Sequence, residues 1–222
     1  MKLLRFFLRI LSFYLIAVMV LGLAYRLVPP PSTLMLAKWM TFHGVERESV
    51  PLKRISPSLL RAVIRAEDSR FCKHSGVDWD SMEEVVEKAA KRGATRGAST
   101  IPMQVAKNLF LWPQRSYIRK ALEVPIALYL DIIWPKSRMM EVYLSIAEWG
   151  DGIYGAEAAA QAYFHKSANQ LTPWESALLA ASLPNPLKRN PAHPSSYLRN
   201  RAGQIQKWAS HSVDTSCLWE KK

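Results

Sequence analysis

Cysteine is nearly absent from this chain of 222 residues, which contains only Cys72 and Cys217. The two lie far apart in the sequence, and neither belongs to a CxxC pair or to a His/Cys spacing that would bind zinc. A single disulfide is one interpretation, and two free thiols are the simpler one. Cysteine usage therefore indicates no metal centre and does not fix the compartment.

Several other patterns are missing as well. Runs of β-branched residues with a period of two are scarce, so we expect a mainly helical protein. No Gly-Lys-Ser/Thr sequence completes a Walker A motif, and no groove-reading helix motif is present. These absences argue against P-loop nucleotide binding and against nucleic-acid binding. There are no internal repeats, and the only low-complexity stretch is a run of three prolines at positions 29–31.

Positive charge, in contrast, is in excess. The chain has 30 Lys and Arg residues against 18 Asp and Glu residues, a formal net charge of +12. Such a balance indicates a polyanionic partner, an anionic membrane surface or a phosphate-bearing substrate, or else a basic surface without a specific partner. A hydrophobic content of 49% and a mean hydropathy of −0.07 exclude both a disordered chain and one with many membrane spans.

One long apolar run lies near the N-terminus. Residues 10–25 carry no charge, and extended to Val28 they would form about 28 Å of helix at 1.5 Å per residue, enough to cross a bilayer core. Lys2, Arg5 and Arg9 precede the run, so the positive-inside rule predicts a cytoplasmic N-terminus and an exported remainder. A cleaved signal peptide is the alternative, but no small-x-small cleavage site follows.

The predicted organisation follows from this run. We expect a cytoplasmic basic tail at 1–9, a transmembrane anchor at 10–28, a linker and membrane-proximal segment at 29–55, and one domain at 56–222. Within the membrane-proximal segment, the apolar residues 34–42 either lie against the membrane surface or form an ordinary first helix of the domain.

The domain has helical patterning throughout. Ser56-Pro57 and Thr172-Pro173 are typical helix starts, and Pro125 is expected to kink or break the helix that contains it. Residues 91–99 are basic, contain glycine and are expected to form a loop. The predicted helices are 57–67, 80–90, 103–111, 117–133, 137–148, 154–164, 174–183 and 195–208.

Candidate chemistry begins at Glu67-Asp68, at the end of an apolar helix. A carboxylate beside apolar neighbours can have a raised pKa and act as a general acid or base, although for an isolated Glu-Asp pair two solvated helix-end acids are the favoured interpretation. Downstream, a small-residue loop at 97–101 precedes a helix with polar side chains on one face. Such a loop can present N–H groups to an anion, and nearby cations can hold a diphosphate. The candidate residues here are Ser99, Gln104, Lys107, Asn108 and Arg115.

A third cluster contains Arg119, Lys120 and Glu123. Arg119 and Glu123 are four residues apart and can form a surface ion pair, or the glutamate can orient the surrounding cations. Two later segments, 143–166 and 171–186, are interpreted as structural, with small residues that allow close helix contact.

Together these segments resemble the glycosyltransferase domain of peptidoglycan polymerases, which class A penicillin-binding proteins share with monofunctional transglycosylases. The resemblance covers residues 57–191 and rests on five blocks in family order. They read EDSRFCKHSG (67–76), GASTIPMQVAKN (97–108), RKALE (119–123), YLSIAEWGDGIYGAEAAAQAYFHK (143–166) and LTPWESALLAASLPNP (171–186).

The resemblance implies an all-α, lysozyme-like domain with two lobes and a cleft between them. It implies that Glu67 is the general base that takes the proton from the acceptor 4-hydroxyl of lipid II, and that the hydroxyl attacks C1 of the lipid-linked chain with inversion. Lys107 and Arg115 match cations near the leaving diphosphate, and Glu123 matches the second family glutamate. Ser99, Gln104 and Asn108 match polar cleft positions, with Arg119 and Lys120 as further candidate substrate-binding residues.

Some positions depart from the family pattern. Met103 stands where a glutamine is usual, with Pro102 before it, and Ser145 stands where asparagine is usual. Ala98 replaces a common glycine. No penicillin-binding SxxK, SxN and KTG arrangement is present, and with the chain ending at Lys222 we expect the monofunctional type.

Four function classes compete for this sequence: a polymerase, a lytic enzyme of similar fold, a non-catalytic scaffold and a nucleic-acid-binding protein. Cations for a diphosphate leaving group and an anchor beside the cleft favour the polymerase. The implied partners are lipid II, the growing glycan chain, the cytoplasmic (inner) membrane and other wall-synthesis or division proteins, without nucleic acid. No cofactor is implied; a divalent cation near the diphosphate is plausible, but the sequence shows no ligand cluster for it.

Overall fold

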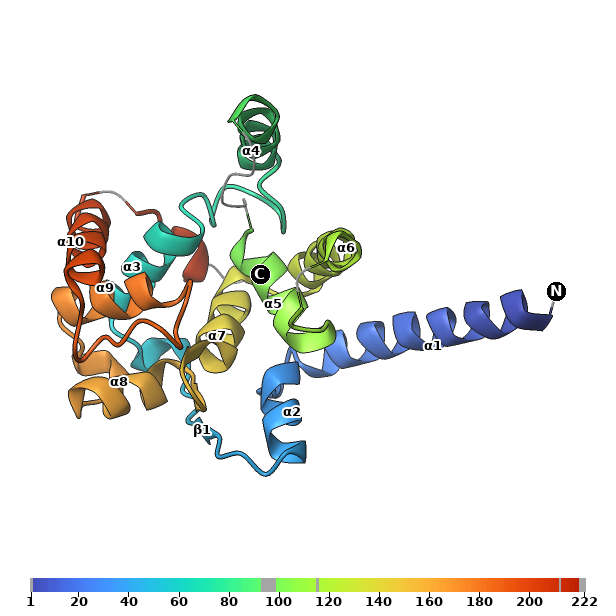
Figure 1. Ribbon diagram of the computed structural model, residues 1–222, viewed down its shortest axis with the longest axis horizontal. Helices are drawn as coiled ribbons and strands as arrows, with labels where there is room; N and C mark the ends of the chain where they lie inside the picture. Colours follow the sequence, from blue (N-terminus) through green and yellow to red (C-terminus); the bar gives the residue numbers. More distant parts are fainter. Residues whose placement is uncertain (1, 93–98, 115, 212, 220–222) are drawn as a thin grey trace.

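The structure, a computed structural model, describes residues 2–92, 99–114, 116–211 and 213–219. In this part of the chain it contains ten α-helices and one small sheet (Figure 1). Helix α1 (Lys2–Ala24) extends away from a body that the other helices form. These are α2 (Thr33–Met40), α3 (Pro57–Glu67), α4 (Trp79–Arg92), α5 (Ile101–Phe110), α6 (Tyr117–Ile133), α7 (Lys136–Ile146), α8 (Ala156–Phe164), α9 (Pro173–Ser182) and α10 (Ser196–Ala209).

The predicted mainly helical fold is confirmed, and the helix starts follow their capping signals. The Ser56 hydroxyl accepts the N–H of Ser58 at the start of α3. At the start of α9, Thr172 and Glu175 form a reciprocal capping box, in which each side chain accepts the backbone N–H of the other. These local bonds satisfy helix N–H groups that have no intrahelical partner, so the sequence alone locates both starts.

A three-stranded sheet interrupts the helices. It consists of β1 (Glu46–Arg47), β2 (Glu148–Gly150) and β3 (Ile153–Tyr154) in the order β1-β3-β2. β1 runs parallel and β2 antiparallel to β3.

The sheet corrects two predicted helices. The helix expected at 154–164 begins only at Ala156, because Tyr154 belongs to β3. The helix expected at 137–148 ends at Ile146, and Glu148 begins β2. The reversal between β2 and β3 depends on Gly152, whose φ is +76° and where a Cβ would lie 2.7 Å from the Gly44 carbonyl oxygen.

The expected break at Pro125 is wrong. Helix α6 runs without interruption from Tyr117 to Ile133 with Pro125 inside it. Proline removes one backbone hydrogen bond. The following residues Ile126, Ala127 and Leu130 are buried in the core, and this packing holds the helix together across the proline.

Two groups of helices surround the centre of the body (Figure 1). In one, α9 packs against α3 and α10; in the other, α5 packs against α6 and α7. The core contains the aromatic side chains of Phe71, Tyr143, Trp149 and Tyr154, each almost fully buried. The C-terminal end of α3 thereby comes to face α5, which positions the site described below.

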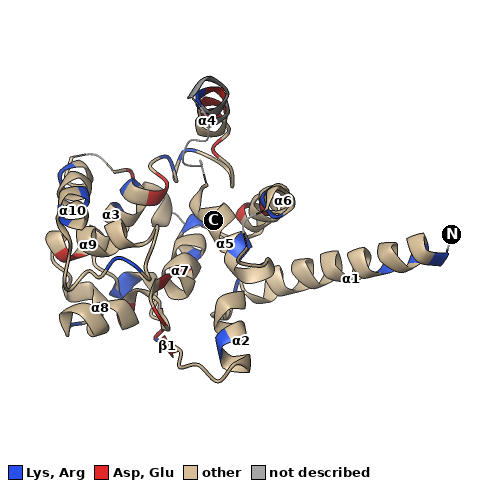
Figure 2. Ribbon diagram, in the orientation of Figure 1, with Lys and Arg blue, Asp and Glu red and all other residues tan. Residues whose placement is uncertain are grey.

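Helix α1 is long and apolar enough to cross a membrane, and most of its side chains are exposed. Its basic side chains are confined to the N-terminal part (Figure 2). The helix ends at Ala24, a few residues before the predicted end of the anchor at Val28. Its C-terminal half is docked on the body. Three hydrogen bonds dock the helix: Tyr14 Oη donates to Phe110 O (3.2 Å), Tyr129 Oη to Met19 O (2.7 Å) and Trp134 Nε1 to Gly22 O (2.8 Å). Just after the helix, Arg138 donates to the carbonyl oxygens of Tyr25 and Val28.

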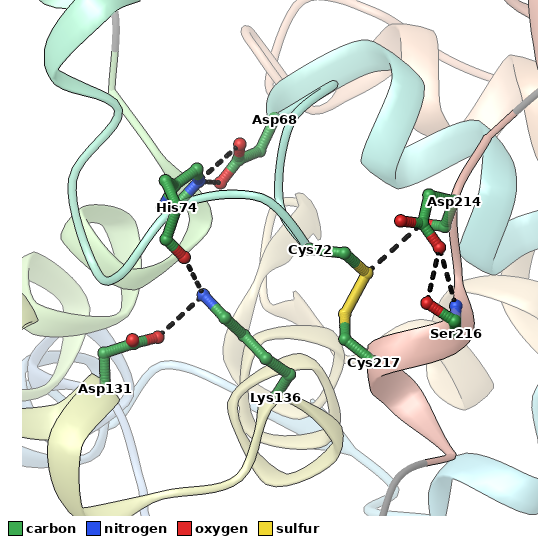
Figure 3. Close-up of a disulfide and its surroundings, with 8 residues drawn as sticks. All are labelled: Asp68, Cys72, His74, Asp131, Lys136, Asp214, Ser216 and Cys217. Atoms are coloured by element: carbon green, nitrogen blue, oxygen red, sulfur yellow. Dashed lines mark hydrogen bonds and ion pairs between the residues drawn. A yellow bond between two sulfur atoms is a disulfide. The ribbon is translucent and has the colours of Figure 1, made fainter.

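The prediction of two free thiols is wrong. Cys72 and Cys217 form a disulfide with a Cα–Cα distance of 5.5 Å, which links residues 145 positions apart (Figure 3). The sequence could not reveal this pairing because it depends on the packing of the 3-10 turn η3 (Ser216–Leu218) against α7. The bond fastens the end of the described chain to the loop that follows α3.

Candidate active site

A cavity of about 560 Å³ opens between the two helix groups. Seven of the residues predicted from the sequence line it: Glu67, Ser99, Gln104, Lys107, Arg119, Lys120 and Glu123. They come from α3, α5, α6 and the residues just before α5. The structure thus brings two carboxylates and three cations to one surface.

Glu67 is the last residue of α3, so the helix sets the direction of its side chain. The other faces of α3 bury Leu59, Leu60, Val63 and Ile64, and Glu67 falls on the side that faces the cavity. Burial raises the pKa of Glu67, although the hydrogen bond from Gln104 and the charges of Arg201 and Lys107 oppose the shift. A carboxyl group with raised proton affinity is suited to general-base work near neutral pH.

The two oxygens of Glu67 have different surroundings. Gln104 Nε2 donates to Oε2 over 2.8 Å, whereas the buried Oε1 has no hydrogen-bond partner among the described residues. Tyr143 Oη in turn donates to Gln104 Oε1 over 3.3 Å, which fixes the orientation of the amide. One carboxylate oxygen is therefore held in place, and the other is left to accept a proton.

Asp68 has a structural position instead. It is buried, and its carboxylate accepts from His74 Nε2 (2.9 Å) and from the backbone N–H of Ile101 (2.9 Å). Lys136 holds the same loop by donating to the His74 carbonyl oxygen and pairing with Asp131 (Figure 3). The interpretation of Glu67-Asp68 as two solvated acids is wrong, since Asp68 ties the end of α3 to the start of α5.

The third predicted cluster is buried as well. Glu123 is only 3% exposed, and its carboxylate pairs with Arg119 (2.5 Å) and Lys120 (2.9 Å). Lys120 Nζ also donates to the Ser99 hydroxyl over 2.6 Å. Of the two interpretations of this cluster, the surface ion pair is therefore wrong. The glutamate lies among cations and holds them at the cavity wall.

Lys107 differs from these paired cations. Within the described ranges, no carboxylate or hydrogen-bond acceptor contacts its ammonium group. Burial lowers the pKa of Lys107, helped by the positive charges of Arg119 and Lys120 and opposed by Glu123 and Glu67. An amine that points into the cavity without a partner can bind an anion from outside.

Two predicted residues are not among these seven. Asn108 lines an adjoining hollow of about 200 Å³, which shares Gln104, Lys107, Leu183 and Pro184 with the main cavity. Arg115 falls outside the described residues, as do Gly97 and Ala98 of the segment expected to form a loop before α5.

Sequence reasoning missed several cavity residues. Segments 143–166 and 171–186 were interpreted as structural, yet Tyr143 orients Gln104, and Pro184 and Asn185 line the cavity. Arg189, after α9, lines it too. None of these carries a local signal; only the packing of α7 and α9 against α5 and α3 brings them to the site.

The described residues contain no group of three or more His, Cys, Asp or Glu side chains that could hold a metal ion. The buried Glu123 already pairs with two cations. The described side chains therefore offer no ready set of carboxylate ligands for a metal ion.

Comparison with known proteins gives a consistent result. A family model described as Transglycosylase matches residues 35–209. Curated proteins named biosynthetic peptidoglycan transglycosylase are similar over most of the chain. The one from Agrobacterium fabrum is 52% identical over 198 residues, covering 86% of this chain and 88% of the relative. That from Rhodospirillum centenum is 47% identical over 208 residues (93% and 90%), and that from Brucella suis is 52% identical over 190 residues (85% and 85%).

Proposed function

Because the chain belongs to the peptidoglycan transglycosylase family, we propose that it joins lipid II units into glycan strands by the catalytic machinery of the cavity described above. The observation that carries the proposal is that a carboxylate with one unbonded oxygen and a cation without a partner among the described residues line the same cavity. Glu67 Oε1 has no partner among the described residues, and Lys107 lies on the same cavity wall.

Glu67 is the proposed general base. Its Oε1 accepts the proton of the acceptor 4-hydroxyl while that oxygen forms a bond to C1 of the donor sugar. The C1–O bond to the diphosphate breaks, and the electron pair leaves with undecaprenyl diphosphate, so the configuration at C1 inverts. Burial supports this role, since it raises the pKa of Glu67 toward the range where a base is effective.

The cations are proposed to neutralise the leaving diphosphate. The ammonium of Lys107 has no partner among the residues that the structure describes. Arg119 and Lys120 are held by Glu123 in fixed positions, so little reorganisation is needed when charge develops. Glu123 then acts by orienting cations. Arg115 is proposed as a further member of this set, on the family resemblance alone.

The proposed location is outside the cytoplasm, with α1 as a single anchor in the cytoplasmic membrane. Three basic residues at the N-terminal end of α1 favour a cytoplasmic N-terminus. The Cys72–Cys217 disulfide supports the same arrangement, since such bonds persist in oxidising compartments. The proposed domain organisation is a tail at 1–9, an anchor at 10–28, a membrane-proximal segment at 29–55 and the enzyme at 56–222.

Incubation of the purified protein in detergent with labelled lipid II tests the proposal. Wild type is compared with Glu67→Gln and with Glu83→Gln, an exposed glutamate of α4 that serves as the matched control. We expect lysozyme-sensitive strands from wild type and Glu83→Gln, and a loss of at least a hundredfold in rate for Glu67→Gln. Normal strand synthesis by Glu67→Gln would overturn the base assignment, and no product from wild type would overturn the function.

A further inference from the structure

A third carboxylate lines the hollow next to Lys107, apart from the machinery proposed above. Glu148 is the first residue of β2, and its side chain is 17% exposed. It lines the hollow of about 200 Å³ together with Gln104, Lys107 and Asn108. This hollow shares four lining residues with the main cavity, so the two lie side by side.

The hairpin of β2 and β3 holds Glu148 through one oxygen. Tyr154 Oη donates to Oε1 over 3.1 Å, and Lys38 Nζ of α2 lies 3.8 Å from the same atom. Lys38 is shared with Asp151, to which it makes the shorter contact. No donor among the described residues contacts Oε2, so this oxygen is left for an outside group.

The environment of Glu148 opposes a second anion. Burial raises the pKa of Glu148, while the Tyr154 hydroxyl and the charge of Lys38 act in the opposite direction. A diphosphate beside this carboxylate would be repelled, whereas a hydroxyl or amide N–H would donate to it in a charge-assisted bond. Lys107 and Gln104 line the side that the hollow shares with the main cavity. The rest of the lining includes the Asn108 amide and apolar side chains such as Leu34 and Ile146, a combination that suits a neutral, hydroxyl-rich ring.

We propose that Glu148 is a substrate-binding residue, whose free oxygen accepts a hydrogen bond from a hydroxyl or N-acetyl N–H of a glycan unit lying beside Lys107. This inference rests on the proposed function, because it takes the saccharide as the ligand. In this arrangement the cations bind the diphosphate in the main cavity, and the Glu148 carboxylate binds the neutral sugar in the adjoining hollow.

The test compares Glu148→Ala and Glu148→Gln with Asp151→Asn. Asp151 shares Lys38 with Glu148 but is absent from the lining of the hollow, and its side chain is 86% exposed. We expect Glu148→Ala to raise the KM for lipid II about tenfold, as for loss of a hydrogen bond to a charged group, with kcat changed less than about twofold. Glu148→Gln keeps an acceptor and should raise KM less, and Asp151→Asn should leave both parameters unchanged.

Direct binding separates this inference from the proposed function. Binding of labelled lipid II is measured in the Glu67→Gln background, which prevents turnover, with and without Glu148→Ala. A weaker affinity with an unchanged melting temperature supports the inference, whether or not the wild type makes strands. Equal affinity would overturn it even in an active polymerase, as would a fall in kcat and melting temperature with KM constant. A loss for Glu148→Gln as large as for Glu148→Ala would indicate a cationic partner and overturn the assignment to a hydroxyl or N–H.

Discussion

At the scale of single residues, the buried carboxylate of Glu67 lowers the stability of the folded protein. Its pKa is raised in the folded protein because burial disfavours the carboxylate. The folded state therefore binds a proton more tightly than the unfolded state. Stability falls as the pH rises from the unfolded pKa through the folded one, and the penalty is fully present above the folded pKa.

Replacing Glu67 by Gln should remove this penalty. Since Gln resembles the protonated acid, we expect Glu67→Gln to melt at a higher temperature than wild type at neutral pH. The difference should shrink as the pH falls from the raised pKa of the folded state, and it should be absent below the ordinary glutamate pKa. Thermal unfolding followed by circular dichroism at pH 4 and pH 7.5 measures it, with Glu83→Gln as the exposed control. A lower melting temperature for Glu67→Gln at neutral pH would show that burial does not penalise the native carboxylate.

The predictability of the site residues depends on how local their signals are. Glu67, Lys107 and Glu123 lie in short blocks whose residue types are readable from the chain, and the cavity brings them together. Tyr143 and Arg189 lie far along the sequence in segments dominated by small and apolar residues. Their approach to Gln104 and the cavity depends on how α7 and α9 pack, which no local pattern specifies.

At the scale of elements, helix starts were easier to predict than reversals. Ser56 and Thr172 cap α3 and α9 through bonds within a few residues, so their signals are local. The β2–β3 reversal and the continuity of α6 past Pro125 depend instead on contacts with Gly44 and with the buried core. Tertiary packing overrode the local propensity in both places.

The contact between α1 and α6 depends on Gly22. A Cβ at this position would lie 2.7 Å from the Tyr129 ring, whose hydroxyl donates to the Met19 carbonyl. We therefore expect Gly22→Ala to displace Tyr129 and lower stability by about 1–3 kcal/mol in detergent, as overpacking does. Gly203 in α10 is the matched control, since a Cβ there meets nothing within 4 Å.

Gly203→Ala should raise stability by about 0.5–1 kcal/mol, because alanine favours the helix. Chemical denaturation of the two variants in the same micelles measures the contrast. If both substitutions stabilise the protein equally, α1 is not docked against Tyr129.

At the scale of the whole molecule, the disulfide joins two segments that lie far apart in the sequence. It encloses α4 to α10 in a covalent loop between Cys72 and Cys217. Closing a loop of this length reduces the freedom of the unfolded chain, so we expect Cys217→Ser to cost about 2–5 kcal/mol of stability. Reductant should lower the melting temperature of wild type to that of the variant and leave the variant unchanged. In intact cells, both thiols should resist alkylation until reductant is added; labelling without reductant would place the domain in a reducing compartment.

The order of synthesis gives the disulfide another consequence. The ribosome synthesises the chain from its N-terminus, so Cys72 is made first and has a free thiol at that stage. Its partner Cys217 is synthesised 145 positions later. At roughly 5–20 residues per second, this interval lasts about 7–30 s. This sequence contains no third cysteine with which the Cys72 thiol could form a non-native disulfide during this interval. Formation of the Cys72–Cys217 bond therefore needs an oxidant, and no other cysteine of this sequence competes for either thiol.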